Sequence, residues 1–332
     1  MRTQYQWPRL AGLLSIVAAS TMIGLPGTSL AQGEFPSKPI RLVVPFAAGG
    51  GTDVAARLIA QKLTEAFKQP VVVENRPGDN SIIGTNFVAK SAPDGYTVGL
   101  LANPGIAPGP LMRASMPYDP IKDFTHLVLV STAPNGFAVR VDHPAKDLQQ
   151  FIDMAKAKPG TLSYGTSGIG SSGFLTGELL KDKAKISIVH VPYTRGNAPM
   201  ITDLMGGHIE VAFDGMLSVS TFVRGGRLRL LAVTGAKRSA LFPDVPTMNE
   251  VVPGVAGEAW NGLSAPANLP PAIADKWQAE IIKVLALPDV RARFQELGST
   301  LVNQGQREYL QHIERENAVN GPIIKAANIR LE

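Results

Sequence analysis

The feature that most constrains the fold is a repeated alternation of short apolar runs with amphipathic segments. Residues 40–46 read Ile-Arg-Leu-Val-Val-Pro-Phe, which predicts a buried strand, and residues 52–68 carry apolar side chains at roughly helical spacing, which predicts a helix. A strand is expected at residues 71–74, a helix at 81–90 and a strand at 96–101. This βαβαβ order is typical of a mostly parallel sheet covered by helices.

The middle of the chain repeats this order. The expected elements are a helix at 148–156, a strand at 162–165, a helix at 172–181, a strand at 186–191, a helix at 198–205, a strand at 211–213, a helix at 218–223 and a strand at 228–234. The end is largely helical, most clearly at 273–285 and 307–318.

Two such α/β units predict two lobes with a ligand cleft between them, because open α/β sheets bind ligands beyond the carboxyl ends of their strands. We place lobe 1 at residues 32–134 plus 234–332 and lobe 2 at residues 135–233. Periodicity does not show which strands cross between the lobes.

The N-terminus predicts export. Arg2 and Arg9 form a basic region, residues 10–25 are uncharged and largely apolar, and residues 29–31 read Ser-Leu-Ala, a small-x-small cleavage pattern. The apolar stretch is shorter than the roughly 20 residues that span a bilayer. We therefore expect a signal peptide at residues 1–31, cleaved after Ala31, and a mature protein in the periplasm that starts at Gln32.

Composition argues against several other functions. The chain has no cysteine, which excludes disulfides, thiol catalysis, Cys-ligated metals and a lipid-modified N-terminus. Its net charge of +5 is spread along the sequence, so we expect no binding to nucleic acid. The five histidines are scattered without ligand spacing, so no metal site is expected. Gly49-x-Gly51 is followed by Val54 where the dinucleotide fingerprint has its third glycine, and no cofactor is expected.

The first candidate loop, residues 45–53, reads Pro-Phe-Ala-Ala-Gly-Gly-Gly-Thr-Asp between a predicted strand and a predicted helix. Glycines leave backbone N–H groups uncovered, and a helix N-terminus adds unpaired donors and partial positive charge. The loop is either an ordinary turn capped by Thr52 or Asp53 or an anion site. Three consecutive glycines exceed what a cap needs and favour the anion site.

The second candidate loop, residues 165–173, again joins a strand to a helix and is rich in hydroxyls. Ser171 and Ser172 can offer O–H and N–H groups to a carboxylate. A serine hydrolase would need Gly-x-Ser-x-Gly, but Ile169 occupies the last position of that pattern. His190 and Asp214 are conceivable triad partners, yet nothing in the sequence brings them together. We expect no catalytic residues.

Two further strand ends lie at residues 190–196 and 211–215, where cleft residues belong. Arg195 either pairs with a carboxylate or is a solvated surface charge. Asp214 either accepts a hydrogen bond from a ligand or water, or caps a turn. His190, between two valines, is expected to be packed.

Over essentially its whole mature length the chain resembles the substrate-binding proteins of tripartite tricarboxylate transporters, the Bug-type receptors. The resemblance is carried by collinear motifs at residues 35–40 (Phe-Pro-Ser-Lys-Pro-Ile), 45–53, 74–78 (Glu-Asn-Arg-Pro-Gly), 93–97 (Pro-Asp-Gly-Tyr-Thr), 170–173 (Gly-Ser-Ser-Gly), 190–193 (His-Val-Pro-Tyr), 203–207 (Asp-Leu-Met-Gly-Gly), 213–214 and 243–247 (Pro-Asp-Val-Pro-Thr).

This resemblance implies an α/β, two-lobed periplasmic binding protein of the type II fold that closes on its ligand by hinge motion and is not an enzyme. It implies capture of a small organic anion, namely a di- or tricarboxylate, an amino acid or an aromatic acid, for membrane permease subunits, and we expect a monomer. The ligand-binding positions it implies, together with those expected from their places at strand ends, are Phe46, Ala48, Gly49, Gly50, Thr52, Asp53, Asn103, Ser167, Gly170, Ser171, Ser172, Thr194 and Asp214.

Two segments depart from the family pattern. Phe174 stands where many relatives carry His, so it either faces the cleft and makes the pocket more apolar or packs under the helix. Residues 103–108 (Asn-Pro-Gly-Ile-Ala-Pro) are unusual for the family. A sensing receptor that hands its ligand to a signalling system and a periplasmic serine hydrolase are the alternative functions.

Overall fold

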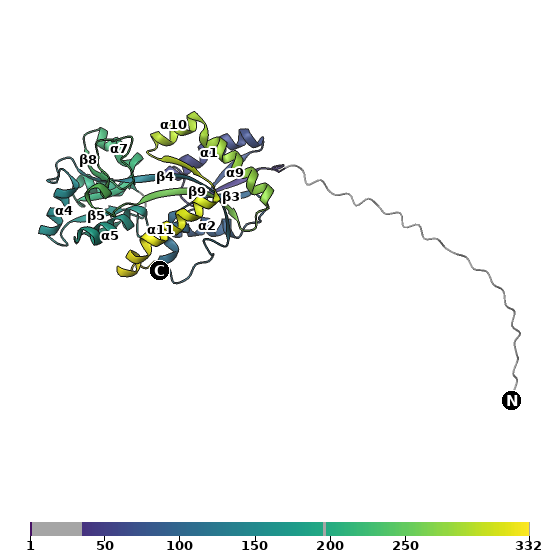
Figure 1. Ribbon diagram of the computed structural model, residues 1–332, viewed down its shortest axis with the longest axis horizontal. Coiled ribbons are helices and arrows are strands. Elements are labelled where there is room, and N and C mark those ends of the chain that lie inside the picture. The colour runs from purple at the N-terminus through teal and green to yellow at the C-terminus, as the bar shows by residue number, and fades with distance from the viewer. Residues whose placement is uncertain (2–34, 195–196, 332) are drawn as a thin grey trace. The chain divides into compact units, whose positions relative to one another are not determined.

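The computed structural model describes Met1, residues 35–194 and residues 197–331 (Figure 1). The predicted signal peptide, its cleavage site and Arg195 lie outside the described residues. Phe35–Glu332 form one compact unit. Among the described residues, ten strands form a connected sheet in the order β2-β1-β3-β9-β4-β7-β5-β6, and β8 and β10 also pair with β4.

Lobe 1 is built on the first predicted βαβαβ unit. Its parallel strands are β1 (Ile40–Val44), β2 (Val71–Asn75) and β3 (Thr97–Ala102), with α1 (Gly51–Phe67) and α2 (Ile82–Ala89) between them. Short helical turns follow β2 and β3, namely η1 (Asp79–Ser81), α3 (Asn103–Ile106) and η2 (Gly109–Met112). The predicted order of elements is confirmed here.

Lobe 2 repeats the arrangement, with β5 parallel to both β6 and β7. Its elements are α4 (Leu148–Ala157), β5 (Ser163–Thr166), α5 (Ser172–Ala184), β6 (Val189–Pro192), α6 (Asn197–Gly206), β7 (Val211–Gly215), α7 (Met216–Arg224) and β8 (Leu228–Val233). Each helix predicted from periodicity in this region is present.

The two lobes share β4 (Phe124–Arg140), a strand of 17 residues to which the sequence analysis assigned no element. From Phe124 to Pro134 it pairs with β9 (Glu258–Pro266), and from Asn135 onward it pairs with β7, both antiparallel. The expectation of a mostly parallel sheet is therefore wrong for the middle of the molecule. The strand is buried along most of its length and contains Pro134, so it shows neither alternation nor the usual composition of a strand.

Alternate residues of the lobe 1 strands point into separate apolar clusters, as the two-residue period of a strand requires. Leu42 and Val44 join a cluster around Trp277 under α1, α9 (Pro271–Ala286) and α10 (Pro288–Glu296). Val43 joins a cluster around Trp260 under α2 and α11 (Gln306–Ala326). Figure 1 shows these two groups of helices on opposite faces of the sheet.

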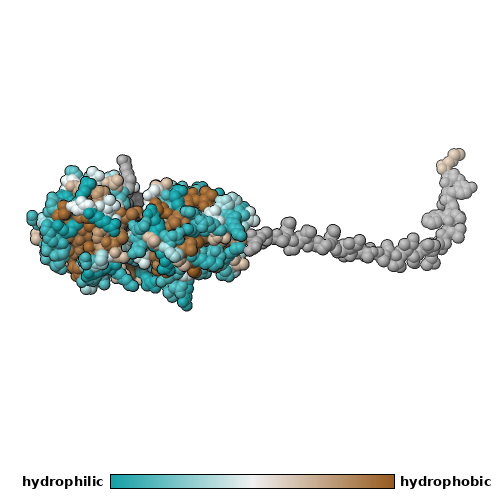
Figure 2. Space-filling view, turned by 90° about the horizontal axis from the view of Figure 1, so that it is seen from above, coloured by the Kyte–Doolittle hydropathy of each residue, from teal (hydrophilic) through white to brown (hydrophobic). Residues whose placement is uncertain are grey.

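Lobe 2 has its own two clusters. One packs Phe137, Phe151 and Phe213 between the sheet and α4 and α5, and the other packs Ala138 and Ala212 against α6 and α7. Figure 2 shows the described part of the chain from above as two halves, each with apolar patches on a largely hydrophilic surface. The lobe boundaries at residues 134 and 234 stay a prediction.

The remaining elements are α8 (Met248–Val251) and β10 (Thr300–Gln304), which pairs with the lobe 1 part of β4. In the described part of the chain, no helix is both long and apolar enough to cross a membrane.

Candidate ligand-binding site

The glycine loop, residues 45–50, joins β1 to α1 and is exposed from Ala47 onward. Of the two alternatives for this loop, the turn capped by Thr52 or Asp53 is wrong, because α1 begins after Gly50 and no side chain caps its N-terminus. Neither Thr52 nor Asp53 acts as the cap, because Gly50 itself takes the extended N-cap conformation. The amide groups of the first turn of α1 are therefore not used by a side-chain cap.

Asp53 has a structural task inside lobe 1. It is 2% exposed, and its carboxylate accepts hydrogen bonds from Gly49 N at 2.9 Å, Asn75 Nδ2 at 2.9 Å and Arg57 Nε at 3.0 Å. Burial by itself would raise the pKa of Asp53, but the donors at Arg57, Gly49 and Asn75 outweigh it and hold the pKa at about 2. The ionised carboxylate fixes the shape of the glycine loop.

The serine loop, residues 165–172, joins β5 to α5. Ser171 is the N-cap of α5, since its Oγ accepts a hydrogen bond from Phe174 N at 3.2 Å and donates one to Gly168 O at 2.7 Å. Ser167 is exposed, whereas Gly170 is buried. The cap leaves the Ser171 hydroxyl occupied and makes Ser172 the hydroxyl at the start of the helix itself.

The start of α1 and the serine loop are each hydrogen-bonded to one of two paired strands, β9 and β4. The Thr52 hydroxyl donates a hydrogen bond to Asn261 Oδ1 of β9 at 3.2 Å. Asn135 Nδ2 of β4 donates a hydrogen bond to Ser172 Oγ at 3.0 Å. These two asparagines were not predicted from the sequence, because an isolated Asn in an apolar strand carries no signal of its own.

The two lobes also touch directly at the serine loop. Asn80 Nδ2, in η1 after β2, donates a hydrogen bond to the Ile169 carbonyl oxygen at 3.1 Å. Asn80 was likewise missed, since the Gly-Asp-Asn-Ser sequence around it indicates only a turn. The turn that follows β2 therefore contacts the serine loop at the junction of the lobes.

Asp214 is the last residue but one of β7 and is 4% exposed. Its Oδ1 accepts hydrogen bonds from Asn197 Nδ2 and, at 2.7 Å, from Gly215 N. Burial raises the pKa of Asp214 to about 6, although hydrogen bonds from Ser218, Gly215 and Asn197 act in the opposite direction.

Two other predicted positions lie differently. Asn103 is 4% exposed and spans β3 and β9, donating to Glu258 O at 3.1 Å and accepting from Trp260 N at 3.3 Å. Asn103 therefore fastens two strands together. Thr194 is exposed at the described end of the segment that follows β6.

Aromatic side chains near the site are packed. Phe174 is 6% exposed and belongs to a cluster with Met112, Leu175 and Ile324, so it packs under α5. Its ring centroid lies 4.7 Å from that of His190. Trp260 is buried in the core, and Phe46 is half-buried against the lobe 1 core.

The geometry gives no support to a triad. His190 Nε2 lies 2.8 Å from Thr166 Oγ1, and burial lowers the pKa of His190 to about 4. Among the described residues, His190 and Asp214 share no hydrogen bond or ion pair with each other or with a serine of the serine loop. The described chain also contains no group of acidic, His or Cys side chains arranged to hold a metal ion.

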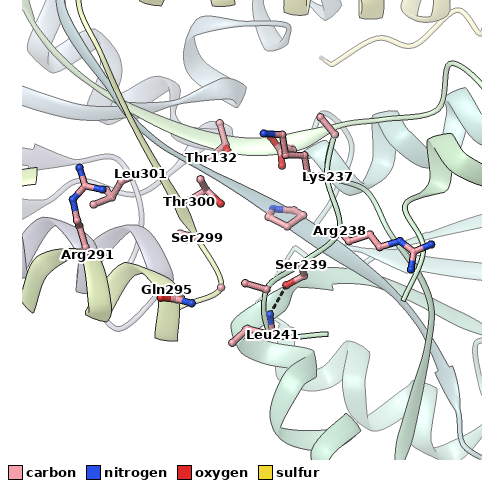
Figure 3. A pocket seen from close by; sticks show the side chains of 15 residues that line it. Thr132, Lys237, Arg238, Ser239, Leu241, Arg291, Gln295, Ser299, Thr300 and Leu301 are labelled. Carbon is pink, nitrogen blue, oxygen red and sulfur yellow. Dashed lines mark hydrogen bonds between the residues drawn. The ribbon is translucent and has the colours of Figure 1, made fainter. Parts of the chain in front are cut away.

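A separate cavity of about 470 Å³ lies beside β4, between α10 and the segment 236–241 (Figure 3). Thr132, Ser239, Glu258 and Thr300 are among its lining residues, and Figure 3 shows the Arg238 side chain pointing away from it. Arg238 instead pairs with Glu250. None of the predicted ligand-binding residues lines this cavity.

Residues 55–329 match the model of the tripartite tricarboxylate transporter family receptor. The chain belongs to this family. Its curated relatives include a protein of Pseudomonas sp. (strain P51), from the UPF0065 group, 37% identical over 80% of this chain and 79% of the relative. Protein BugT of Bordetella pertussis is 33% identical over 89% of this chain and 90% of its own.

Solved structures of this receptor family share the two-lobed α/β fold. An R. palustris protein with adipate superposes with a TM-score of 0.81 and 33% identity, covering 90% of this chain and 99% of its own. The periplasmic binding protein BugD gives a TM-score of 0.78 at 30% identity, covering 90% and 100%. MatC of Rhodopseudomonas palustris with bound malate gives 0.77 at 29% identity, covering 87% and 100%. The predicted fold class is confirmed.

Proposed function

We propose that this receptor captures a small carboxylate in the periplasm, between its two lobes, and delivers it to the membrane subunits of a tripartite tricarboxylate transporter without altering it chemically. One observation carries the proposal: Thr52, just after the glycine loop, and Ser172 of the serine loop, which we assign to different lobes, are hydrogen-bonded to two strands that pair with each other, β9 and β4. A ligand that bridges the loops would pull directly on the hinge.

The glycine loop is suited to the carboxylate end of the ligand. The first turn of α1 presents amide groups that no side chain caps, and a helix N-terminus favours negative charge. The positions proposed to line this end are Phe46, Ala48, Gly49, Gly50 and Thr52, with Asp53 holding the loop in shape.

The serine loop is suited to the far end of the ligand. Ser167, Gly170, Ser171 and Ser172 offer hydroxyl and amide groups, with Thr194 and Asp214 at neighbouring strand ends. These groups are neutral donors and acceptors, except for Asp214. Related proteins with adipate and with malate support a ligand that carries a carboxylate at one end and a polar group at the other.

The periplasmic location assumes removal of residues 1–31. It is supported by similar structures that are described as a periplasmic transporter and as the periplasmic binding protein BugD. Because one chain supplies both lobes, we propose that the receptor acts as a monomer. The receptor needs no cofactor for this task, since closure is driven by contacts that one ligand makes with both lobes.

A thermal-shift screen of residues 32–332 tests the proposal with adipate, malate, citrate, glutamate, benzoate and the amides of adipate and malate. A ligand that binds only the folded state adds about 2.7 kcal/mol at a hundredfold excess over its dissociation constant. We expect a shift with at least one acid and none with its amide.

Two variants locate the site. Ser172→Ala is expected to weaken the shift, whereas Ser239→Ala, which changes a hydroxyl in the separate cavity, is expected to leave it unchanged. The reverse pattern would move the ligand to the cavity, and no shift with any acid would contradict the proposal.

A further inference from the structure

The turn that carries Asn80 has an unusual backbone. Asp79, Asn80 and Ser81 all have positive φ angles, of 45°, 51° and 77°. Residues other than glycine rarely take this conformation, because the Cβ atom crowds the backbone, and Asn and Asp tolerate it best. Three such residues in succession persist only where surrounding contacts stabilise them.

Those contacts come from lobe 1. Asp79 forms an ion pair with Arg113, which follows η2, and the Arg113 side chain is 13% exposed. Ser81, at the other end of the turn, is 2% exposed. The turn is thus anchored at both ends, and its middle residue projects toward lobe 2.

Asn80 meets the serine loop beside Gly170, where the space around the backbone is narrow. Its Nδ2 donates to the Ile169 carbonyl at 3.1 Å, and the next residue, Gly170, has a φ of 85°. A Cβ atom on Gly170 would lie 3.0 Å from Asn80 Nδ2, 3.3 Å from Met112 Cε and 3.6 Å from Leu331 Cδ1. These three lobe 1 and C-terminal side chains form a socket around Gly170.

The socket is itself tied together. Leu331 N donates a hydrogen bond to Met112 O at 2.8 Å, and Met112 packs with Phe174 and Ile324. The serine loop is therefore gripped at Ile169 and Gly170, immediately before the hydroxyls of Ser171 and Ser172.

We propose that Asn80 is a positioning residue that holds the serine loop against lobe 1 and so retains the bound ligand. This inference rests on the proposed function, because it assigns a role within the same site. The Asn80–Ile169 hydrogen bond must break before the lobes can part and release the ligand. Its loss should raise the dissociation rate constant about three- to tenfold, as expected for one net hydrogen bond, with little change in the association rate constant.

The test measures lobe separation in the full mature chain. Since the sequence has no cysteine, Val72→Cys in β2 and Val189→Cys in β6 allow spin labels at two sites that are 56% and 50% exposed. Distances are measured by pulsed EPR without ligand and with adipate, and adipate dissociation is followed by stopped flow. Asn80→Ala and Asn80→Gly are compared in this background with the unsubstituted residue.

The two substitutions separate contact from backbone strain. Both remove the amide, but only Gly relieves the cost of the positive φ. We expect the same shift toward longer distances and the same faster dissociation in both, although Asn80→Gly should be the more heat-stable. If Asn80→Ala showed longer distances and faster dissociation but Asn80→Gly did not, the inference would be overturned. The defect would then result from the lower stability of the Ala variant and not from the lost amide.

Asn268→Ala is the matched control. Asn268 also has a positive φ, of 62°, but it is an exposed residue in the loop after β9. The Asn268→Ala substitution should leave the spin-label distances unchanged. An increase in distance equal to that of Asn80→Ala would count against the inference. The inference would also be overturned if the unsubstituted protein gave distances as long as those of the Asn80 variants, both with and without adipate. The carboxylate screen would still decide the proposed function in that case.

Discussion

Asn135 in the strand shared by the two lobes donates a hydrogen bond to the Ser172 hydroxyl at the first residue of α5, at 3.0 Å. The bond joins the residue at which β4 changes its pairing partner to the loop proposed to hold the far end of the ligand. A shift of β4 at Asn135 would therefore also move the Ser172 hydroxyl.

A double-mutant cycle measures this link. Asn135→Ala and Ser172→Ala each remove the same hydrogen bond, so their effects on the binding free energy of the acid that gives the largest thermal shift should not add. We expect a coupling energy of about 0.5–1.5 kcal/mol from isothermal titration calorimetry. Full additivity of the two substitutions would show that the bond does not contribute to binding.

Asp53→Asn should loosen the glycine loop. The substitution removes the charge that accepts from Gly49, Asn75 and Arg57, and we expect a loss of about 1–3 kcal/mol in the free energy of unfolding at pH 7, measured in urea. Because the folded pKa is depressed to about 2, the stabilisation is present above pH 4 and is lost as pH falls through 2. The deficit of the variant should therefore shrink in acid. Asp153→Asn, at an exposed residue of α4, is the control and should show neither effect.

Gly170→Ala should reduce ligand affinity more than its backbone strain alone explains. Gly170 and Gly226 both have positive φ, of 85° and 67°, but only the first has neighbours within 4 Å of an added Cβ. We expect both substitutions to Ala to cost roughly 1 kcal/mol in unfolding free energy. Only Gly170→Ala should weaken binding of the acid identified by the thermal-shift screen, as measured by calorimetry. Equal binding losses in the two variants would refute a role for the socket.

Because of Glu316 on α11, the free energy of unfolding should fall as pH rises. Burial raises the pKa of Glu316 to about 7, the neighbouring Trp260 side chain acts in the opposite direction, and the nearby Glu258 carboxyl adds to the rise. The folded state therefore binds more protons than the unfolded state between about pH 5 and 7, so its stability is greatest below this window and declines through it.

Glu316→Gln should abolish this decline. We expect the variant to gain about 2 kcal/mol relative to the wild type on going from pH 5 to pH 8, in urea unfolding at each pH. Glu314→Gln, at an exposed residue of the same helix, should retain the wild-type slope. If Glu316→Gln lost stability with rising pH as steeply as the wild type does, the fall in unfolding free energy would have to come from other groups.

The sequence by itself determined the alternation of strands and helices, the two loops and the family. These are local properties: the spacing of apolar residues from 52 to 68 and the run of glycines at 49–51 need no partner to be recognised. The β4 strand was not predicted because it is buried along most of its length, which removes the alternation of apolar and polar residues on which strand prediction depends.

Only the tertiary structure decided how the loops are held. Thr52 and Asn261 are 209 residues apart in sequence, and Asn80 and Ile169 are 89 apart, so no local pattern connects them. It also assigned Asp53 to the support of the glycine loop and Phe174 to the packing under α5. Which polar group meets a ligand and which holds the loop depends on the hydrogen-bond partners that folding brings within reach, and a linear sequence does not specify those partners.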